Sequence, residues 1–173
     1  MFYLKLLKRE VLLEPVHLGK HLKDRVRDRV FYEVEGTCIG KQGYVITILE
    51  LKDEDIIPGL IDNDSGAVNV IVWYRAILFR PFENEVLDAV VTTTSDESGF
   101  SASAGPLTIF VSRHCMQEDI HFDYVKGDAW TSDDGEVEIR EGSVVRLRIL
   151  GLTIGPDQMD AVGTIKDDFL GLI

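Results

Sequence analysis

One short stretch of the sequence divides the chain. Residues 73–86 read Trp-Tyr-Arg-Ala-Ile-Leu-Phe-Arg-Pro-Phe-Glu-Asn-Glu-Val, and apolar residues dominate up to Phe79, as in a buried strand. Pro81 has no backbone N–H and favours an extended conformation for Arg80, and apolar alternation resumes at Val86. We therefore predict two domains, 1–80 and 81–173, with a junction too short to act as a flexible tether.

The net charge belongs to the second of these domains. Residues 1–80 contain 12 basic and 12 acidic side chains, whereas residues 81–173 contain 6 basic and 18 acidic ones, which accounts for the net charge of −12. A negative field repels a phosphate backbone. The charge therefore disfavours tight nonspecific binding of nucleic acid by the isolated chain, although a local basic patch is compatible with weak binding.

Composition indicates a globular protein of the cell interior. Apolar residues make up 45% and charged residues 28% of the 173 positions. No apolar run approaches the roughly 20 residues of a membrane span, and the N-terminus has no basic segment followed by an apolar one, so we expect neither a membrane anchor nor a signal peptide. The two cysteines, Cys38 and Cys115, fall in different expected domains, which argues against a disulfide framework.

The first domain shows a strand–helix–strand–strand pattern. Residues 2–13 alternate as a strand, with a bend or bulge expected near residue 9, where Lys-Arg-Glu interrupts the alternation. Pro15 is placed to open a helix, and Gly36 is placed to close it. Residues 38–51 and 67–79 are the two further strands. This order, with one helix on a sheet, is typical of an incomplete ferredoxin-like or RNA-recognition-type fold.

The helix is expected to be amphipathic. Its apolar stripe has four-residue spacing and consists of Leu18, Leu22, Val26 and Val30.

A long connection separates the second and third expected strands. Residues 52–66 are polar at both ends and apolar in the middle, where Ile56, Ile57, Leu60 and Ile61 flank Pro58-Gly59. Long connections in compact domains are usually functional or disordered. These side chains form either an exposed patch for a partner or a lid that folds back on the core, and composition alone leaves both open.

The second domain is predicted to be all-β. The expected strands cover residues 86–94, 100–104, 107–111, 144–152 and 160–165, with turns that contain glycine between several of them. Five short strands of this kind suit a small Greek-key barrel of the OB type. Residues 112–142 are expected to form an acidic surface excursion with a short hairpin, and the apolar residues 169–173 are expected to dock on the barrel.

No catalytic or metal-binding pattern emerges. His17 and His21 have the spacing of a zinc pair but no third ligand, and the Asx-rich residues 62–66 lack the glycine position and the final Glu of a calcium loop. Gly40-Lys41 lacks the upstream glycine of a phosphate-binding loop. No nucleophile has a neighbouring base. We expect a non-enzymatic interaction protein without a cofactor.

Several short motifs, in order and at matching spacing, resemble those of a known family. They are Met-Phe-Tyr at the start, residues 34–38 with 40–44, residues 74–76 with 79–82, Gly99-Phe100, Gly105-Pro106, Phe110-Val111 with His114 and Met116, and the ending 163–171. In these motifs, and in its total length, the chain resembles the family of larger stalk subunits of RNA polymerases, which comprises the seventh subunit of eukaryotic RNA polymerase II and its archaeal counterpart.

The resemblance implies a truncated RNA-recognition-like tip domain followed by an S1-type OB barrel. In the family, the tip anchors the stalk to the polymerase core near the clamp. The matching residues here are Pro15, Val16, His17, Leu18 and Gly19, together with Ile56, Ile57, Pro58, Gly59, Leu60 and Ile61. The resemblance favours the exposed-patch interpretation of the apolar residues in the long connection. It also implies a smaller stalk subunit as partner, a role in transcription initiation and a nuclear location.

The S1-type barrel is expected to meet emerging single-stranded RNA. The positions that match RNA-contacting residues of S1 domains are Phe100, Phe110, Arg113 and His114. Aromatic rings stack on bases, while Arg and His contact phosphate. For Phe100, a place in the barrel core and contact with RNA are about equally compatible with the sequence, whereas for Phe110 the apolar run 109–111 favours the core.

Two alternatives to a polymerase II subunit remain at this stage. One is the stalk subunit of another polymerase, either archaeal or polymerase III. The other is a free S1-type RNA-binding protein in RNA processing or translation, which predicts a basic face and autonomous affinity for RNA. The excess of acidic residues argues against this last class.

Overall fold

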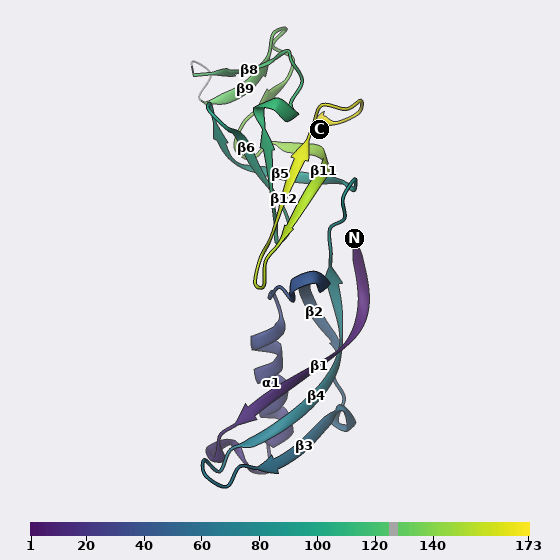
Figure 1. Cartoon of the computed structure of the whole chain (residues 1–173), viewed down its shortest axis with the longest axis vertical. Helices are drawn as coiled ribbons and strands as arrows, with labels where there is room; N and C mark the ends of the chain where they lie inside the picture. Colours follow the sequence, from purple (N-terminus) through teal and green to yellow (C-terminus); the bar gives the residue numbers. More distant parts are fainter. Residues whose placement is uncertain (125–127) are drawn as a thin grey trace. The chain divides into compact units, whose positions relative to one another are not determined.

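Strand β4 (Val68–Phe79) is the centre of the first of two units, Met1–Arg80 and Pro81–Ile173, in the computed structural model of the chain (Figure 1). The structure describes residues 1–124 and 128–173, and most ordered elements in these ranges are strands. Only one α-helix occurs among them, and no helix there is long and apolar enough to cross a membrane.

The first unit contains a four-stranded antiparallel sheet. β4 pairs along its whole length with β1 (Phe2–Leu13), from Phe2 opposite Phe79 to Leu13 opposite Val68. Its other side is shared by β2 (Tyr44–Glu50) and β3 (Ile56–Ile61). The bulge predicted near residue 9 is wrong, because the register continues unbroken through the pair Arg9–Val72. The Arg9 side chain instead reaches Glu33 of the helix at 3.4 Å.

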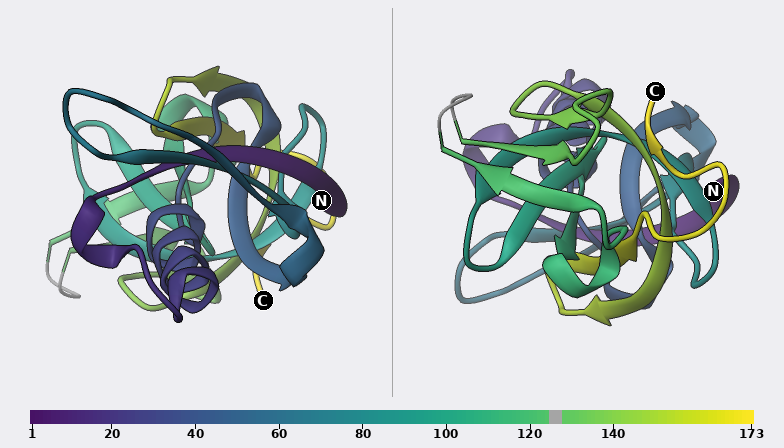
Figure 2. Two further views of the ribbon diagram at one scale, coloured as in Figure 1. Left: turned by 90° about the horizontal axis from the view of Figure 1, so that it is seen from below. Right: turned by 90° about the horizontal axis from the view of Figure 1, so that it is seen from above.

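One helix covers one face of this sheet (Figures 1 and 2). Helix α1 (Leu22–Val34) buries Val26, Val30 and Val34 against the sheet. Pro15 does not open this helix as predicted but a separate 3-10 turn, η1 (Pro15–His17), because Gly19, a poor helix former, intervenes. Gly36 follows the helix with φ of 77°, the conformation expected of a closing glycine.

The expected second strand is shorter than predicted. A 3-10 turn, η2 (Gly40–Gln42), precedes β2, and before it only the bridge between Cys38 and Tyr44 remains. Gly43 sits between the two elements at φ of 100°, where an added Cβ would lie 2.3 Å from the Phe79 carbonyl oxygen. The close approach of the two backbones, together with this φ, requires glycine here.

The long connection is not a loop. It holds the 3-10 turn η3 (Asp53–Asp55) and then strand β3, which pairs with β4 from Ile56 opposite Val72 to Ile61 opposite Val68. The register shifts between Pro58 and Ile61, and Gly59 lies so close to Asn69 that a Cβ would be 2.0 Å from its carbonyl oxygen. β3 is an edge strand, the kind of strand that tolerates proline.

The second unit is a closed five-stranded barrel, compatible with an OB-fold. Its strands are β5 (Val86–Ser95), β6 (Gly99–Ala104), β7 (Leu107–Ser112), β11 (Val144–Ile154) and β12 (Met159–Thr164). They pair in the order β12-β7-β6-β5-β11, and pairing of β11 with β12 closes the barrel. The β7–β12 pair is parallel, and the other pairs are antiparallel.

The segment between β7 and β11 is more than a surface excursion. Strands β8 (Ile120–Asp123), β9 (Ala129–Ser132) and β10 (Glu138–Ile139) form a three-stranded sheet next to the barrel strands, which the right-hand view of Figure 2 shows. All of β9 is buried, and Trp130 packs edge-on against Phe122. The part of the predicted excursion at residues 125–127 lies outside the described residues.

The C-terminal residues dock on the barrel as expected. Strand β13 (Gly171–Leu172) pairs with β11, and the Ile173 N–H donates to the Val144 carbonyl at 3.0 Å. Phe169 is the exception, because its side chain is almost fully exposed on the turn before β13.

Candidate functional site

The two segments expected to bind the polymerase core converge at one end of the first unit. Leu13, the last residue of β1, and Ile61, the last of β3, both lie opposite Val68 of β4. η1 follows β1 directly, and the turn after β3 returns to it: a Cβ on Gly66 would lie 3.0 Å from Cγ of Pro15. The fold therefore brings residues 15–19 and 56–66 side by side.

This end of the unit presents apolar side chains to solvent. Val16 is 81% exposed, Leu60 90% and Ile61 60%. We call these three residues the tip patch; Pro15, His17, Gly19, Pro58 and Gly59 are exposed around them. An exposed apolar group of this kind is a candidate contact site for a partner.

Three of the predicted docking residues, Leu18, Ile56 and Ile57, lie outside the exposed end formed by the tip patch and the residues around it. Ile56 is 4% exposed and belongs to the core beneath β4, which corrects its assignment to an exposed docking patch. Leu18 is half-buried and packs on the same core. Ile57 is exposed but lies opposite Ile71, on the face of the sheet away from the helix. Of the two interpretations of this segment, the lid fits Ile56, and the exposed patch fits Leu60 and Ile61.

The turn beneath the tip patch is held by its own polar groups. The Asp62 carboxylate accepts hydrogen bonds from the Ser65 hydroxyl at 2.5 Å and the Ser65 N–H at 3.3 Å, and these bonds hold its pKa below the ordinary value. Asp62 N–H donates to the Ala67 carbonyl at 2.8 Å, and Gly66 N–H to that of Asp62 at 2.8 Å. The Asx-rich stretch is therefore a structural turn that fixes the end of β3.

A small cavity adjoins the tip patch between η1 and α1. It measures about 280 Å³ and is lined by Leu13, His17, Arg25, Asp28, Arg29 and Tyr32. The Tyr32 ring is 90% exposed at its edge. Next to the apolar tip patch, this cavity therefore presents the guanidinium groups of Arg25 and Arg29. The Arg29 guanidinium is paired with the Glu33 carboxylate at 2.8 Å.

The predicted RNA-contacting residues of the barrel separate into two groups. Phe100 is 1% exposed in the barrel core, so its ring is not available to stack on a base, which corrects its assignment to the RNA-binding set. Phe110 alternates with the fully buried Ile109 and Val111, so it faces outward and is half-buried, and the apolar run misleadingly favoured the core for it. Arg113 and His114 are exposed on the 3-10 turn η4 (Arg113–Cys115) that follows β7.

The structure adds two basic side chains that the sequence did not point to. A cavity of about 200 Å³ is lined by Arg113, His114, Met116, Gln117, Glu118, Ile120, His121 and Lys166. Lys166 pairs with Glu118 at 3.5 Å, and His121 with Asp133 at 3.2 Å. No spacing in the sequence relates His121 or Lys166 to Arg113. The cluster gathers basic side chains on an otherwise acidic unit, and the Lys166 and His121 side chains are each paired with a carboxylate.

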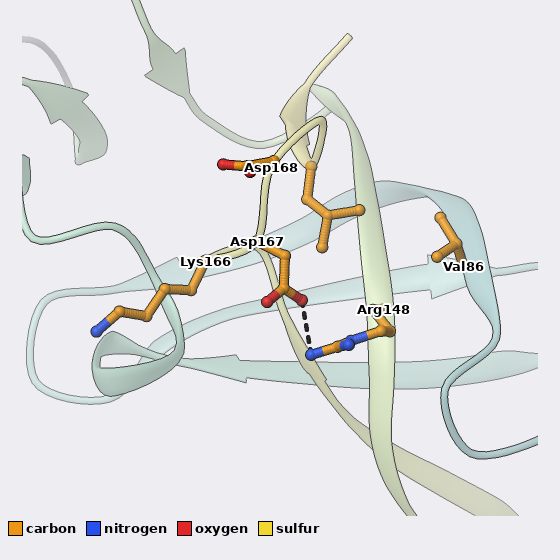
Figure 3. A pocket seen from close by; sticks show the side chains of 6 residues that line it. Val86, Arg148, Lys166, Asp167 and Asp168 are labelled. Carbon is orange, nitrogen blue, oxygen red and sulfur yellow. Dashed lines mark ion pairs between the residues drawn. The ribbon is translucent and has the colours of Figure 1, made fainter.

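A second barrel cavity is crossed by an ion pair. It measures about 580 Å³ and is lined by Val86, Arg148, Lys166, Asp167, Asp168 and Leu170 (Figure 3). The Arg148 guanidinium meets the Asp167 carboxylate at 2.7 Å and so ties the C-terminal segment to β11. Figure 3 shows this pair spanning the cavity, with Asp168 directed elsewhere. The cavity contains no nucleophile with a base, and its arrangement is that of a structural clasp.

Metal ligands do not cluster in the described part of the chain. Residues 1–124 and 128–173 contain no group of three or more His, Cys, Asp or Glu side chains placed to hold an ion. His17 lies in η1, whereas His21 precedes α1 and pairs with Asp24 at 3.5 Å. Their spacing suggested that the two histidines share one helix face, but the structure places them outside a common helix.

A helix-covered antiparallel sheet with an exposed apolar end, followed by a closed β-barrel, is typical of proteins that bind other macromolecules. No protein-family model matches the chain. Curated relatives do match over its full length. The chain is 40% identical to the DNA-directed RNA polymerase II subunit RPB7 of Glycine max over 173 residues, which cover 100% of this chain and 97% of that one.

Two fungal relatives agree. The RNA polymerase II subunit rpb7 of Schizosaccharomyces pombe is 38% identical over 172 residues, 99% of each chain. The RNA polymerase II subunit RPB7 of Saccharomyces cerevisiae is 34% identical over 174 residues, 100% of each chain. The chain therefore belongs to the RPB7 family of RNA polymerase II subunits.

Proposed function

We propose that this chain is a non-catalytic stalk subunit of RNA polymerase II that docks on the polymerase core, near the clamp, through the tip patch. One observation carries the proposal. Residues 15–19 and 56–66, far apart in sequence, meet at one end of the first unit and there expose Val16, Leu60 and Ile61. The relatives are named as RNA polymerase II subunits, and we therefore take that polymerase as the complex to which this end docks.

The energetics of the patch suit a docking site. Full burial of an exposed Val, Leu or Ile side chain contributes about 1.5–3 kcal/mol. Leu60 and Val16 are each more than four-fifths exposed, so contact with the core gains most of that amount for each. A carboxylate at either position would be buried without a partner and would oppose binding strongly.

The stalk makes further contacts besides its docking on the core. The first unit is a truncated RNA-recognition-like, ferredoxin-like tip domain, the barrel is of the S1 type, and the smaller stalk subunit forms a heterodimer with this chain. The basic side chains around Arg113 and His114, with Phe110 on the adjoining strand, form the surface that meets emerging RNA weakly. The subunit acts in transcription initiation, in the nucleus and without a cofactor.

The test of core docking uses matched surface variants. Tagged Val16→Asp and Leu60→Asp chains, each assembled with the smaller stalk subunit, are compared with wild type for capture of core polymerase. Leu150→Asp, which places the same charge at an exposed apolar position of the barrel, is the control. Ile56→Asp is unsuitable, because that side chain belongs to the core.

We expect both tip variants to lose core polymerase and the control to retain it. Capture by the tip variants at the wild-type level would refute docking through the tip patch. If the wild-type chain does not bind core polymerase but binds single-stranded RNA tightly on its own, the stalk role is refuted and a free S1-type RNA-binding protein is favoured.

A further inference from the structure

The two flanks of helix α1 have different surroundings. On one flank, Lys23 and Arg27 both pair with Asp53 of η3, Lys23 at 4.0 Å. The other flank carries exposed side chains at helical spacings of three and four residues, namely Arg25, Asp28, Arg29 and Tyr32. These four line the cavity between η1 and α1, and the left-hand view of Figure 2 shows η1 beside the helix. This second flank is therefore open to solvent.

The cavity has room for one inserted side chain. Leu13, which is 1% exposed, forms its floor, whereas Tyr32 at its rim is 90% exposed. The volume of about 280 Å³ is below the roughly 300–1,000 Å³ of most small-molecule sites. An apolar floor under a polar and aromatic rim suits a side chain with an apolar body and a polar end.

The charges around the cavity balance one another. Arg29 pairs with Glu33 at 2.8 Å, so the charge of this guanidinium is compensated. Arg25 and Asp28 both line the cavity, and neither has an ion-pair partner among the residues that the structure describes. A phosphate or a carboxylate in the cavity would be repelled by Asp28, and a cation would be repelled by Arg25. The cavity therefore favours a neutral side chain.

An aromatic side chain with a polar hydrogen matches each group of the lining. Guanidinium groups stack on aromatic faces, and the cavity offers those of Arg25 and Arg29. The Tyr32 ring can pack edge-on against a second ring. A phenol O–H or an indole N–H can donate a hydrogen bond to the Asp28 carboxylate. Tyrosine and tryptophan meet all these conditions, and both are enriched among the anchor residues of protein interfaces.

The cavity is continuous with the tip patch. His17 lines the cavity and directly follows Val16 of the patch in η1. Leu13 of the cavity floor and Ile61 of the patch both lie opposite Val68 of β4. A protein that covers the tip patch therefore also reaches the mouth of the cavity.

We infer that the cavity between η1 and α1 receives one tyrosine or tryptophan side chain of the core polymerase, stacked on Arg25 and Arg29 and hydrogen-bonded to Asp28. The inference rests on the proposed docking of the tip patch on the core, and it adds a specific anchor to that apolar contact. Apolar burial is non-directional, whereas a ring held in a shaped cavity fixes the orientation of the docked unit.

The first test measures the affinity of the stalk heterodimer for core polymerase. Arg25→Ala and Tyr32→Ala each remove one wall of the cavity at an exposed position, and Tyr32→Phe keeps the ring. Lys23→Ala removes a charge from the opposite flank of the same helix and is the control. We expect Kd to rise about 5- to 30-fold for each of the first two variants, and to change by less than about twofold for Tyr32→Phe and Lys23→Ala.

The salt dependence of this effect distinguishes a neutral side chain from a charged one. Because the inserted ring carries no charge, the factor by which Arg25→Ala raises Kd should be the same at about 50 mM and about 300 mM salt. A factor that disappears at the higher salt concentration would show that Arg25 binds a carboxylate or a phosphate, and would overturn the inference.

Photo-crosslinking identifies the inserted side chain. A chain with p-benzoylphenylalanine in place of Tyr32 is assembled with the smaller stalk subunit and core polymerase and irradiated. Mass spectrometry should find a cross-linked core peptide that contains tyrosine or tryptophan. The same replacement of the exposed Tyr124 is the control and should capture no core peptide. Cross-links from position 32 only to the smaller subunit, to RNA, or to core peptides without these residues would overturn the inference.

The outcomes separate the inference from the docking on which it rests. If Val16→Asp and Leu60→Asp abolish capture of core polymerase while Arg25→Ala and Tyr32→Ala bind it with the wild-type Kd, the inference is overturned and the docking stands. If the wild-type heterodimer does not bind core polymerase, the proposed function itself is refuted.

Discussion

Phe100 and Phe110 lie on opposite sides of the barrel wall, which gives a direct test of the structure. The Phe100 ring is 1% exposed, whereas Phe110 is half-buried and points outward between residues that point in. Phe100→Ala removes a core ring and leaves a cavity, at a cost of about 3–5 kcal/mol. Phe110→Ala loses about half of the burial of one ring and leaves no closed cavity, at a cost of about 1 kcal/mol.

Urea unfolding measures the difference. In a Trp73→Phe background, fluorescence of the buried Trp130 reports on the second unit alone. With an m-value of about 1.5 kcal/mol per M, a gap of about 3 kcal/mol separates the two midpoints by about 2 M. Phe100→Leu serves as a milder variant if the alanine variant does not fold, with the same order expected. Equal shifts for the two positions, or a larger one for Phe110, would refute the assignment of faces.

Two further predictions concern other parts of the chain. The Arg146 guanidinium donates hydrogen bonds at 2.7 and 2.9 Å to the Asp88 carboxylate and holds its pKa below the ordinary 3.8. A carboxyl whose pKa is lowered by folding stabilises the folded state above its unfolded pKa, and that stabilisation is lost as the pH falls through its folded pKa. Asp88→Asn should therefore lower Tm at pH 7, and the difference in Tm from wild type should disappear below pH 3.8. A Tm difference that stays constant with pH would contradict this prediction. Gly43→Ala places a Cβ 2.3 Å from the Phe79 carbonyl oxygen at a positive φ and should lower the free energy of unfolding by more than about 1 kcal/mol. Gly19→Ala, which has open space around it, should lower it by less. Thermal melts that rank the two variants the other way would refute the close approach at Gly43.

The sequence predicted elements better than it predicted their faces. The alternation of apolar and polar residues in β1 predicted a strand, but it did not predict that Leu4 and Leu6 are exposed while Leu7 and Val11 are buried. A period of two marks both faces equally, and only the pairing partner decides which one meets the helix. The same limit explains Phe110, whose apolar neighbours hid an outward direction.

The tip patch was predicted in content but not in construction. Residues 52–66, with Pro58-Gly59 in their middle, were predicted to be a long connection, yet β3 forms here as an edge strand with a register shift. Ile56 then lies opposite Val72 and joins the core, while Leu60 and Ile61 do not. The meeting of β3 with η1 depends on β4, which is paired with both β1 and β3, and no local pattern records such a contact.

The long antiparallel pair between β1 and β4 has a consequence for synthesis. Phe2 pairs with Phe79, so the first strand of this unit is completed only by its last strand. Until β4 leaves the ribosome, β1 lacks the strand with which it pairs, and closing so wide a loop slows that pairing. During that interval the nascent chain displays an unpaired, apolar strand to which chaperones, or the strands of neighbouring polysomal chains, have first access.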